Sequence, residues 1–171
     1  MSYYNFALSL RAAGKPVDAL GSAERSLEVR QRLADDHPEV ARLQSDLAQS
    51  HTLTGFMHNE NARTADALVS YGKALAIHQR LADAHPDVPE YQSNLGVTLF
   101  NIGGIELAGG RPREADGWMA RAVDATRAAF RTNPLNPYYL DCHRFHVIST
   151  DQLVSGRGRR GGNVPVALCH L

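Results

Sequence analysis

The chain has 171 residues, with 18 basic and 18 acidic side chains and a formal net charge of zero. A chain of this length is expected to form one domain with a substantial core. Its balanced charge argues against a nucleic acid or an anionic membrane as the main partner, because either would need a basic face.

The sequence carries no recognisable targeting signal, which predicts a cytoplasmic protein. No run of about eighteen apolar residues occurs, so the sequence predicts no transmembrane helix and no membrane partner. The basic residues of the N-terminus follow its apolar stretch, which is the wrong order for a signal peptide. The two cysteines, Cys142 and Cys169, allow at most one disulfide, which is far from the disulfide framework of a small secreted protein.

Residues 1–37 predict a helical hairpin. Its turn, Gly14-Lys15-Pro16, places a glycine where a helix ends and a proline in the first turn of the next helix. The second helix is expected to end at His37-Pro38, because proline disfavours helical geometry in the residue before it.

Residues 38–85 repeat this hairpin. Residues 18–47 align with residues 66–95 at a shift of 48, and 16 of the 30 pairs are identical. Apolar residues recur at helical spacing from Val40 to Met57 and again from Ala67 to Leu81, on either side of a polar break near 59–64. Chance does not explain this identity, so the chain is built from internal repeats.

The repeat continues more faintly to the end of the chain. Residues 86–133 form a third copy with its turn at 108–112, and residues 134–153 start a fourth. Residues 154–171 are rich in glycine and arginine and are expected to be a disordered tail. Arginines 157, 159 and 160 invite an RNA-binding interpretation, but they lack interleaved aromatic residues, and a flexible tail is the better interpretation.

Small residues recur where two helices would approach closely. A glycine inside a helix costs about 1 kcal/mol against alanine, yet Gly55 and Gly103 occupy equivalent places in their copies. The second helices carry two further small positions: Ala19, Ala67 and Ala115, and then Ser26, Ala74 and Ala122. We therefore expect tight packing between the helices of each hairpin.

Together these small positions resemble the tetratricopeptide repeat. The LADxHPxV linker, at 33–40 and 81–88, is further similar to the long repeats of kinesin light chains and of bacterial multidomain proteins. The 48-residue period exceeds the usual repeat of about 34 residues, so both helices would be longer. The resemblance implies an all-α fold, an α-solenoid of antiparallel helix hairpins in a right-handed superhelix, over residues 1–153.

Both ends of the array are expected to be incomplete. Residues 1–13 supply only the later half of a first helix and would expose an apolar end made of Tyr3, Tyr4, Phe6, Leu8 and Leu10. Terminal repeats normally carry polar caps. Either the chain is a fragment of a longer protein, or this end packs on another chain by self-association.

No catalytic, cofactor or metal site is predicted. Cys142, His143 and His146 form a C-H-x-x-H pattern, but zinc needs four ligands or three and a water, and only Cys169 and His170 could join them. The histidines His51 and His58 share one helix face, where packing explains them better than catalysis. No nucleophile motif or phosphate-binding glycine loop occurs.

The resemblance implies that the first helices line a concave groove for a protein or peptide ligand. The groove positions would be Tyr4, Leu8, Arg11, Gln49, Thr52, Phe56, Asn59, Val97, Phe100, Gly104 and Leu107. Several of the apolar ones could equally be core. Only Arg11 and Asn59 suit a clamp for an acidic C-terminus, so an extended or helical peptide held through Phe56 and Phe100 is preferred. Replacing both phenylalanines is then expected to weaken binding without unfolding the array.

Three hypotheses follow from the sequence. The first is a non-enzymatic adaptor that binds a protein or peptide segment. The second is the repeat-bearing part of a larger protein, for instance a bacterial serine/threonine protein kinase. The third, a small metal-binding protein that uses Cys142, His143 and His146, has the least support.

Overall fold

A computed structural model of the chain describes residues 2–154 and contains seven helices over that range. They are α1 (Tyr3–Ala12), α2 (Pro16–Asp36), α3 (Ala41–Glu60), α4 (Thr64–Ala84), α5 (Pro89–Ala108), α6 (Pro112–Thr132) and α7 (Pro137–Val154). The all-α fold of helix hairpins predicted from the sequence is confirmed. The predicted disordered tail lies outside the described residues, apart from Val154.

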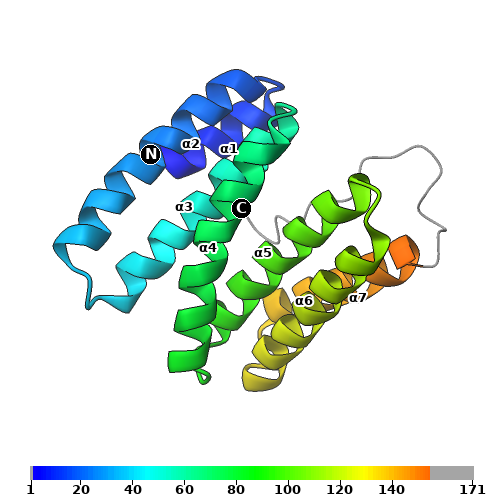
Figure 1. Cartoon of the computed structure of the whole chain (residues 1–171). Helices are drawn as coiled ribbons and strands as arrows, with labels where there is room; N and C mark the ends of the chain where they lie inside the picture. The colour runs from blue at the N-terminus through cyan, green and yellow to red at the C-terminus, as the bar shows by residue number, and fades with distance from the viewer. Residues whose placement is uncertain (1, 155–171) are drawn as a thin grey trace. The chain divides into compact units, whose positions relative to one another are not determined.

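The helices form two compact units, which we describe separately. In unit 1, which ends at Leu81, α1 packs on α2 and α2 on α3. In unit 2, which begins at Ala82, α5 packs on α6, and α7 packs on both of them. Figure 1 shows these consecutive helices side by side within each unit.

Three equivalent turns join the helices of each hairpin. The second residue after each first helix adopts a positive φ, with values of 71° at Gly14, 59° at Ala62 and 76° at Gly110. At the last turn, the amide of Arg111 donates to the carbonyl of Glu106 and the amide of Gly110 donates to that of Leu107. The other two turns repeat both bonds. This is the Schellman arrangement, which needs a left-handed residue and explains the small residue at each turn.

The repeated linker is a second structural device. The amide of Val40 donates to His37 and the amide of Val88 donates to His85, which closes the same tight turn in both copies. The side-chain amide of Gln44 donates to the carbonyl of Ala34 at 3.0 Å, and that of Gln92 donates to Ala82 at 3.2 Å. These bonds satisfy carbonyls at the end of the preceding helix, so the linker residues serve the fold.

Glycines allow the close packing predicted inside each hairpin. A β-carbon built at Gly55 would lie 3.0 Å from the Tyr71 ring, and one at Gly103 would lie 2.9 Å from Met119. The small residues of the second helices are buried as well. Hairpin packing is therefore set by backbone proximity, with little room for larger side chains.

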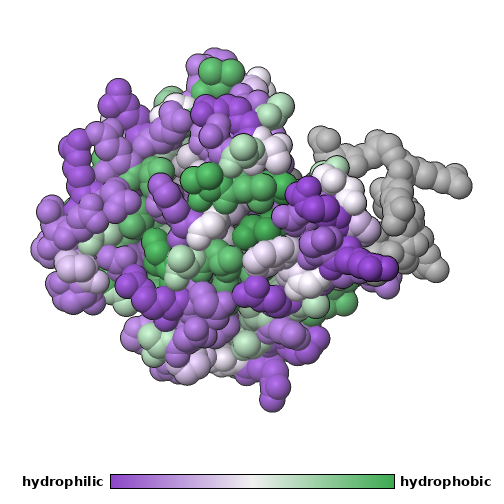
Figure 2. Space-filling view, in the orientation of Figure 1, coloured by the Kyte–Doolittle hydropathy of each residue, from purple (hydrophilic) through white to green (hydrophobic). Residues whose placement is uncertain are grey.

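Charged residues make up much of the solvent side of α2. Its exposed positions include Glu24, Arg25, Glu28 and Arg32, and Figure 2 shows mainly hydrophilic surface over this helix at the left of the view. Arg32 pairs with Glu28 one turn away. Helix α2 thus has a largely charged outer face, and its inner face packs on α1 and α3.

Candidate functional site: the surface of the first helices

The positions predicted to line a groove divide by burial within unit 1. Tyr4, Thr52 and Phe56 are buried, and only 1% of the Phe56 surface is exposed. Leu8, Gln49 and Asn59 are partly exposed, and Arg11 is exposed. A ligand that approaches α1 and α3 would therefore meet these last four residues. We call them the peptide surface.

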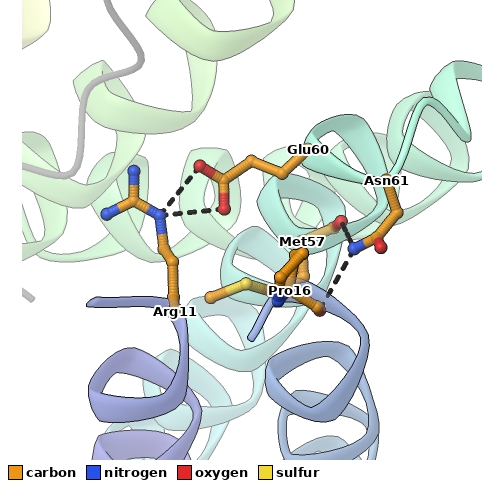
Figure 3. A network of polar contacts seen from close by, with 5 residues as sticks. All are labelled: Arg11, Pro16, Met57, Glu60 and Asn61. Atoms are coloured by element: carbon orange, nitrogen blue, oxygen red, sulfur yellow. Dashed lines mark hydrogen bonds and ion pairs between the residues drawn. The ribbon is translucent and has the colours of Figure 1, made fainter. Parts of the chain in front are cut away.

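Arg11 is fixed by two contacts with α3. Its Nε lies 2.9 Å from both carboxylate oxygens of Glu60, as Figure 3 shows. Its guanidinium carbon also lies 4.5 Å from the centre of the Phe56 ring, a cation–π distance. The Arg11 guanidinium is thus ion-paired and stacked on Phe56, the aromatic residue predicted from the sequence to contact a peptide.

Asn61 anchors the end of α3 to the start of α2. Its side-chain amide donates to the carbonyl of Met57 at 2.7 Å and to the carbonyl of Pro16 at 3.2 Å (Figure 3). The bond to Pro16 spans 45 residues of sequence. It holds the end of α3, which carries Asn59 and Glu60, in place against α2.

Arg30 has a comparable role around Tyr4. Its guanidinium carbon lies 4.6 Å from the centre of the Tyr4 ring, and its Nη1 donates to the carbonyl of Asp46 at 2.9 Å. The same atom donates to Ser50, whose hydroxyl also bonds that of Ser26. These contacts hold Tyr4 in the interior between α1, α2 and α3.

In unit 2 most of the predicted groove positions are interior. Val97, Phe100 and Gly104 are buried, and the Phe100 ring is fully covered. Its centre lies 5.6 Å from that of Phe145 and 4.8 Å from that of His146, both on α7. Leu107 alone of these positions is partly exposed.

The buried histidines are held in the neutral form. Burial, together with nearby Lys73, lowers the pKa of His51 to about 4. Burial and His51 itself lower the pKa of His78 to about 3, and burial and His143 do the same for His146. Uncharged imidazoles of this kind belong to helix packing, as predicted for His51.

The C-H-x-x-H residues turn to different neighbours. The Sγ atom of Cys142 lies 3.8 Å from the Ser93 hydroxyl, and Nδ1 of His143 lies 3.3 Å from the Thr126 hydroxyl. His146 packs on Phe100, and neither of its ring nitrogens has a hydrogen-bond partner. Within residues 2–154 no three metal-ligating side chains come together. Cys169 and His170 lie outside the described residues.

Two contacts near the ends of α1 and α3 were not anticipated from the sequence. Glu60 was overlooked because its counterparts in the other copies are the alanines Ala12 and Ala108. The available signal was the 49-residue spacing of Arg11 and Glu60, one repeat plus one residue, which places opposite charges on successive first helices. Asn61 likewise looked like part of a polar break.

No helix in the described part of the chain is long and apolar enough to cross a membrane.

Comparison with known proteins gives one match. Residues 1–39 match the family model of the tetratricopeptide repeat, which supports a repeat protein of this type. The match covers the first copy of the 48-residue repeat, including α1, α2 and the turn at Gly14. No curated protein and no solved structure matches the chain.

Proposed function

We propose that the chain is a non-catalytic scaffold that binds a peptide segment of a partner protein along α1 and α3. Tetratricopeptide repeats are in general protein-interaction modules without catalysis, and residues 1–39 match that family. The observation that carries the proposal is the peptide surface of unit 1. Leu8, Gln49 and Asn59 stay partly exposed there, and Arg11 stays exposed, although most of α3 is buried.

The chemistry of this surface suits an extended, largely uncharged peptide. The amide side chains of Gln49 and Asn59 can both donate to and accept from a peptide main chain. Leu8 supplies apolar contact area. Because Arg11 is already paired with Glu60, an acidic peptide would have to displace a carboxylate to reach it. The same pair argues against a clamp for acidic C-termini.

Helix length supports the long-repeat variety within this family. Helices α3 to α6 have 20 or 21 residues each, longer than a repeat of about 34 residues allows for two helices and their connections. We therefore propose that the chain belongs with the long repeats that resemble those of kinesin light chains.

The test is selection of binding peptides followed by substitution. Peptides selected from a random library on the full chain are expected to bind at least about tenfold more weakly to a Leu8→Ala/Asn59→Ala double variant, since it removes an apolar contact and an amide. Circular dichroism should show unchanged helicity, because both residues are partly exposed.

Arg25→Ala is the matched control. Its side chain is 71% exposed on the outer face of α2, so affinity should not change. Failure to enrich any peptide, or equal binding by the double variant, would contradict the proposal.

A further inference from the structure

Helix α7 has an exposed side that carries both charged and apolar residues. The helix packs on α5 and α6 (Figure 1), but four of its positions are exposed: Arg144, Val147, Ile148 and Asp151. Their spacing places them on one side of the helix. Val147 is 41% exposed and Ile148 is 50% exposed. We call these four residues the α7 face.

The same positions lie inside the hairpins of the earlier copies. The counterparts, at one or two shifts of 48 residues, are all buried: Ala48, His51, Thr52 and Gly55 on α3, and Gly96, Leu99, Phe100 and Gly103 on α5. A β-carbon built at Gly96 would lie 2.5 Å from Thr126 of α6, and one built at Gly103 would lie 2.9 Å from Met119. The second helix of a hairpin thus approaches where the first helix has no side chain.

Arginine and aspartate replace these two glycines on α7. Arg144 is the counterpart of Gly96, and Asp151 is the counterpart of Gly103. Because even a methyl group would collide at the spacing of α5 and α6, no helix can pack on the α7 face that closely, whatever sequence follows α7. An occupant of this face must pack at a wider spacing and meet two opposite charges. Neither residue forms an ion pair within residues 2–154.

The α7 face is complementary to itself. Arg144 lies three residues before Val147, and Asp151 lies three residues after Ile148. The two charges are therefore equally far from the centre of the apolar pair. When a second α7 crosses this centre in the antiparallel direction, Arg144 of each copy lies opposite Asp151 of the other. The apolar residues of the two copies then cover each other, so a two-fold axis matches both the charges and the apolar surface.

We propose that two copies of the chain associate through their α7 faces. The helices lie antiparallel, with an ion pair between Arg144 and Asp151 on each side of an apolar centre made of Val147 and Ile148. Each copy contributes a single helix, so the interface is small and the dimer is weak and reversible. The α7 face lies in unit 2 and the peptide surface in unit 1, and neither proposal depends on the other.

Reversal of single charges tests the pairing. Sedimentation equilibrium of the full chain at increasing concentration is expected to show a shift from monomer to dimer. Arg144→Asp gives each α7 face two negative charges, and Asp151→Arg gives each face two positive charges. Like charges then meet on both sides of the two-fold axis, so each variant alone should dimerise at least about tenfold more weakly.

Combining the two reversals restores opposite charges. In an equimolar mixture of the single variants, a negative face meets a positive one, so heterodimers should form about as tightly as the unmodified dimer. The double variant Arg144→Asp/Asp151→Arg has the two charges exchanged and should dimerise by itself. A single variant that had merely lost its fold would not recover on mixing, so the rescue separates pairing from damage to the structure.

Arg25→Asp is the matched control, because it makes the same change of charge on the outer face of α2, where Arg25 is 71% exposed. It should dimerise like the unmodified chain. The Leu8→Ala/Asn59→Ala variant should also dimerise normally, so failure of this proposal is distinguishable from failure of the peptide surface.

Three results would overturn the proposal. The first is an unmodified chain that stays monomeric up to its highest soluble concentration. The second is a dimer that neither single reversal weakens, because another surface would then hold it together. The third is a pair of weakened single variants that do not associate when mixed, which would contradict the antiparallel pairing of Arg144 with Asp151.

Discussion

At the scale of single residues, the close approach of α5 and α6 explains why residue 96 is a glycine. Alanine at this position would press its β-carbon against Thr126 and the Ala122 carbonyl. We predict that Gly96→Ala lowers the free energy of unfolding by about 1–3 kcal/mol, the usual cost of overpacking. Urea denaturation followed by circular dichroism measures it.

Gly117→Ala is the matched control in α6. A β-carbon there meets nothing within 4 Å, so alanine should stabilise the helix by up to about 1 kcal/mol through its higher helix propensity. Destabilisation of equal size by both substitutions would show that helix separation is not the cause.

The left-handed turn residues make a second prediction at this scale. Ala62 adopts a φ of 59°, a conformation that glycine accepts without strain. Ala62→Gly should therefore stabilise the chain slightly, by about 0.5 kcal/mol after the entropy of the unfolded state is included. Gly110→Ala should destabilise it by about 1 kcal/mol. The same sign for both changes would contradict the turn assignment.

Phe56 and Phe100 illustrate what the sequence could and could not reveal. Periodicity placed both on first helices, but α3 and α5 are buried on almost all sides around them, and apolar spacing does not distinguish a groove from a core there. Their burial predicts that either change to alanine costs about 3–5 kcal/mol. If either variant binds a peptide more weakly, this loss of stability would explain it without a direct contact between the phenylalanine and the peptide.

At the scale of helices, the packing of α3 on α4 should make the stability of the chain fall at acidic pH. The pKa values of His51 and His78 are about 4 and about 3, below the value of 6.5 expected when the chain unfolds. As the pH falls below 6.5, the unfolded chain binds protons that the folded chain does not, so stability declines from pH 6.5 towards 4. The loss at pH 5 should be on the order of 1–2 kcal/mol for each histidine.

The third copy supplies the control for this prediction. Leu99 is the buried counterpart of His51, so His51→Leu should keep the packing and make the pH dependence shallower. Thermal midpoints between pH 7.5 and 5 measure the slope. An unchanged slope would mean that His51 does not titrate in this range.

Helix boundaries were the most predictable feature at this scale. Prolines at 16, 89, 112 and 137 begin helices, and Gly14 and Gly110 follow helix ends, because both residue types act through local backbone geometry. The ion pair of Arg11 with Glu60 was not predictable in this way, because it depends on which helix of another copy lies alongside.

At the scale of the whole molecule, the repeats share the same turns and linkers but differ in their exposed residues. The turns and linkers recur every 48 residues and maintain the hairpins. Leu8, Arg11, Gln49 and Asn59 differ from their counterparts and are partly or fully exposed. A repeat that keeps its packing and varies its surface is suited to binding other chains.

Hydrogen–deuterium exchange of the full chain with a library-selected peptide tests the central claim most directly. If α1 and α3 form the binding surface, the peptide should slow exchange in residues 3–12 and 41–60 and leave the outer helix α2 unchanged. Protection confined to α2, or no protection at saturating peptide, would contradict the account.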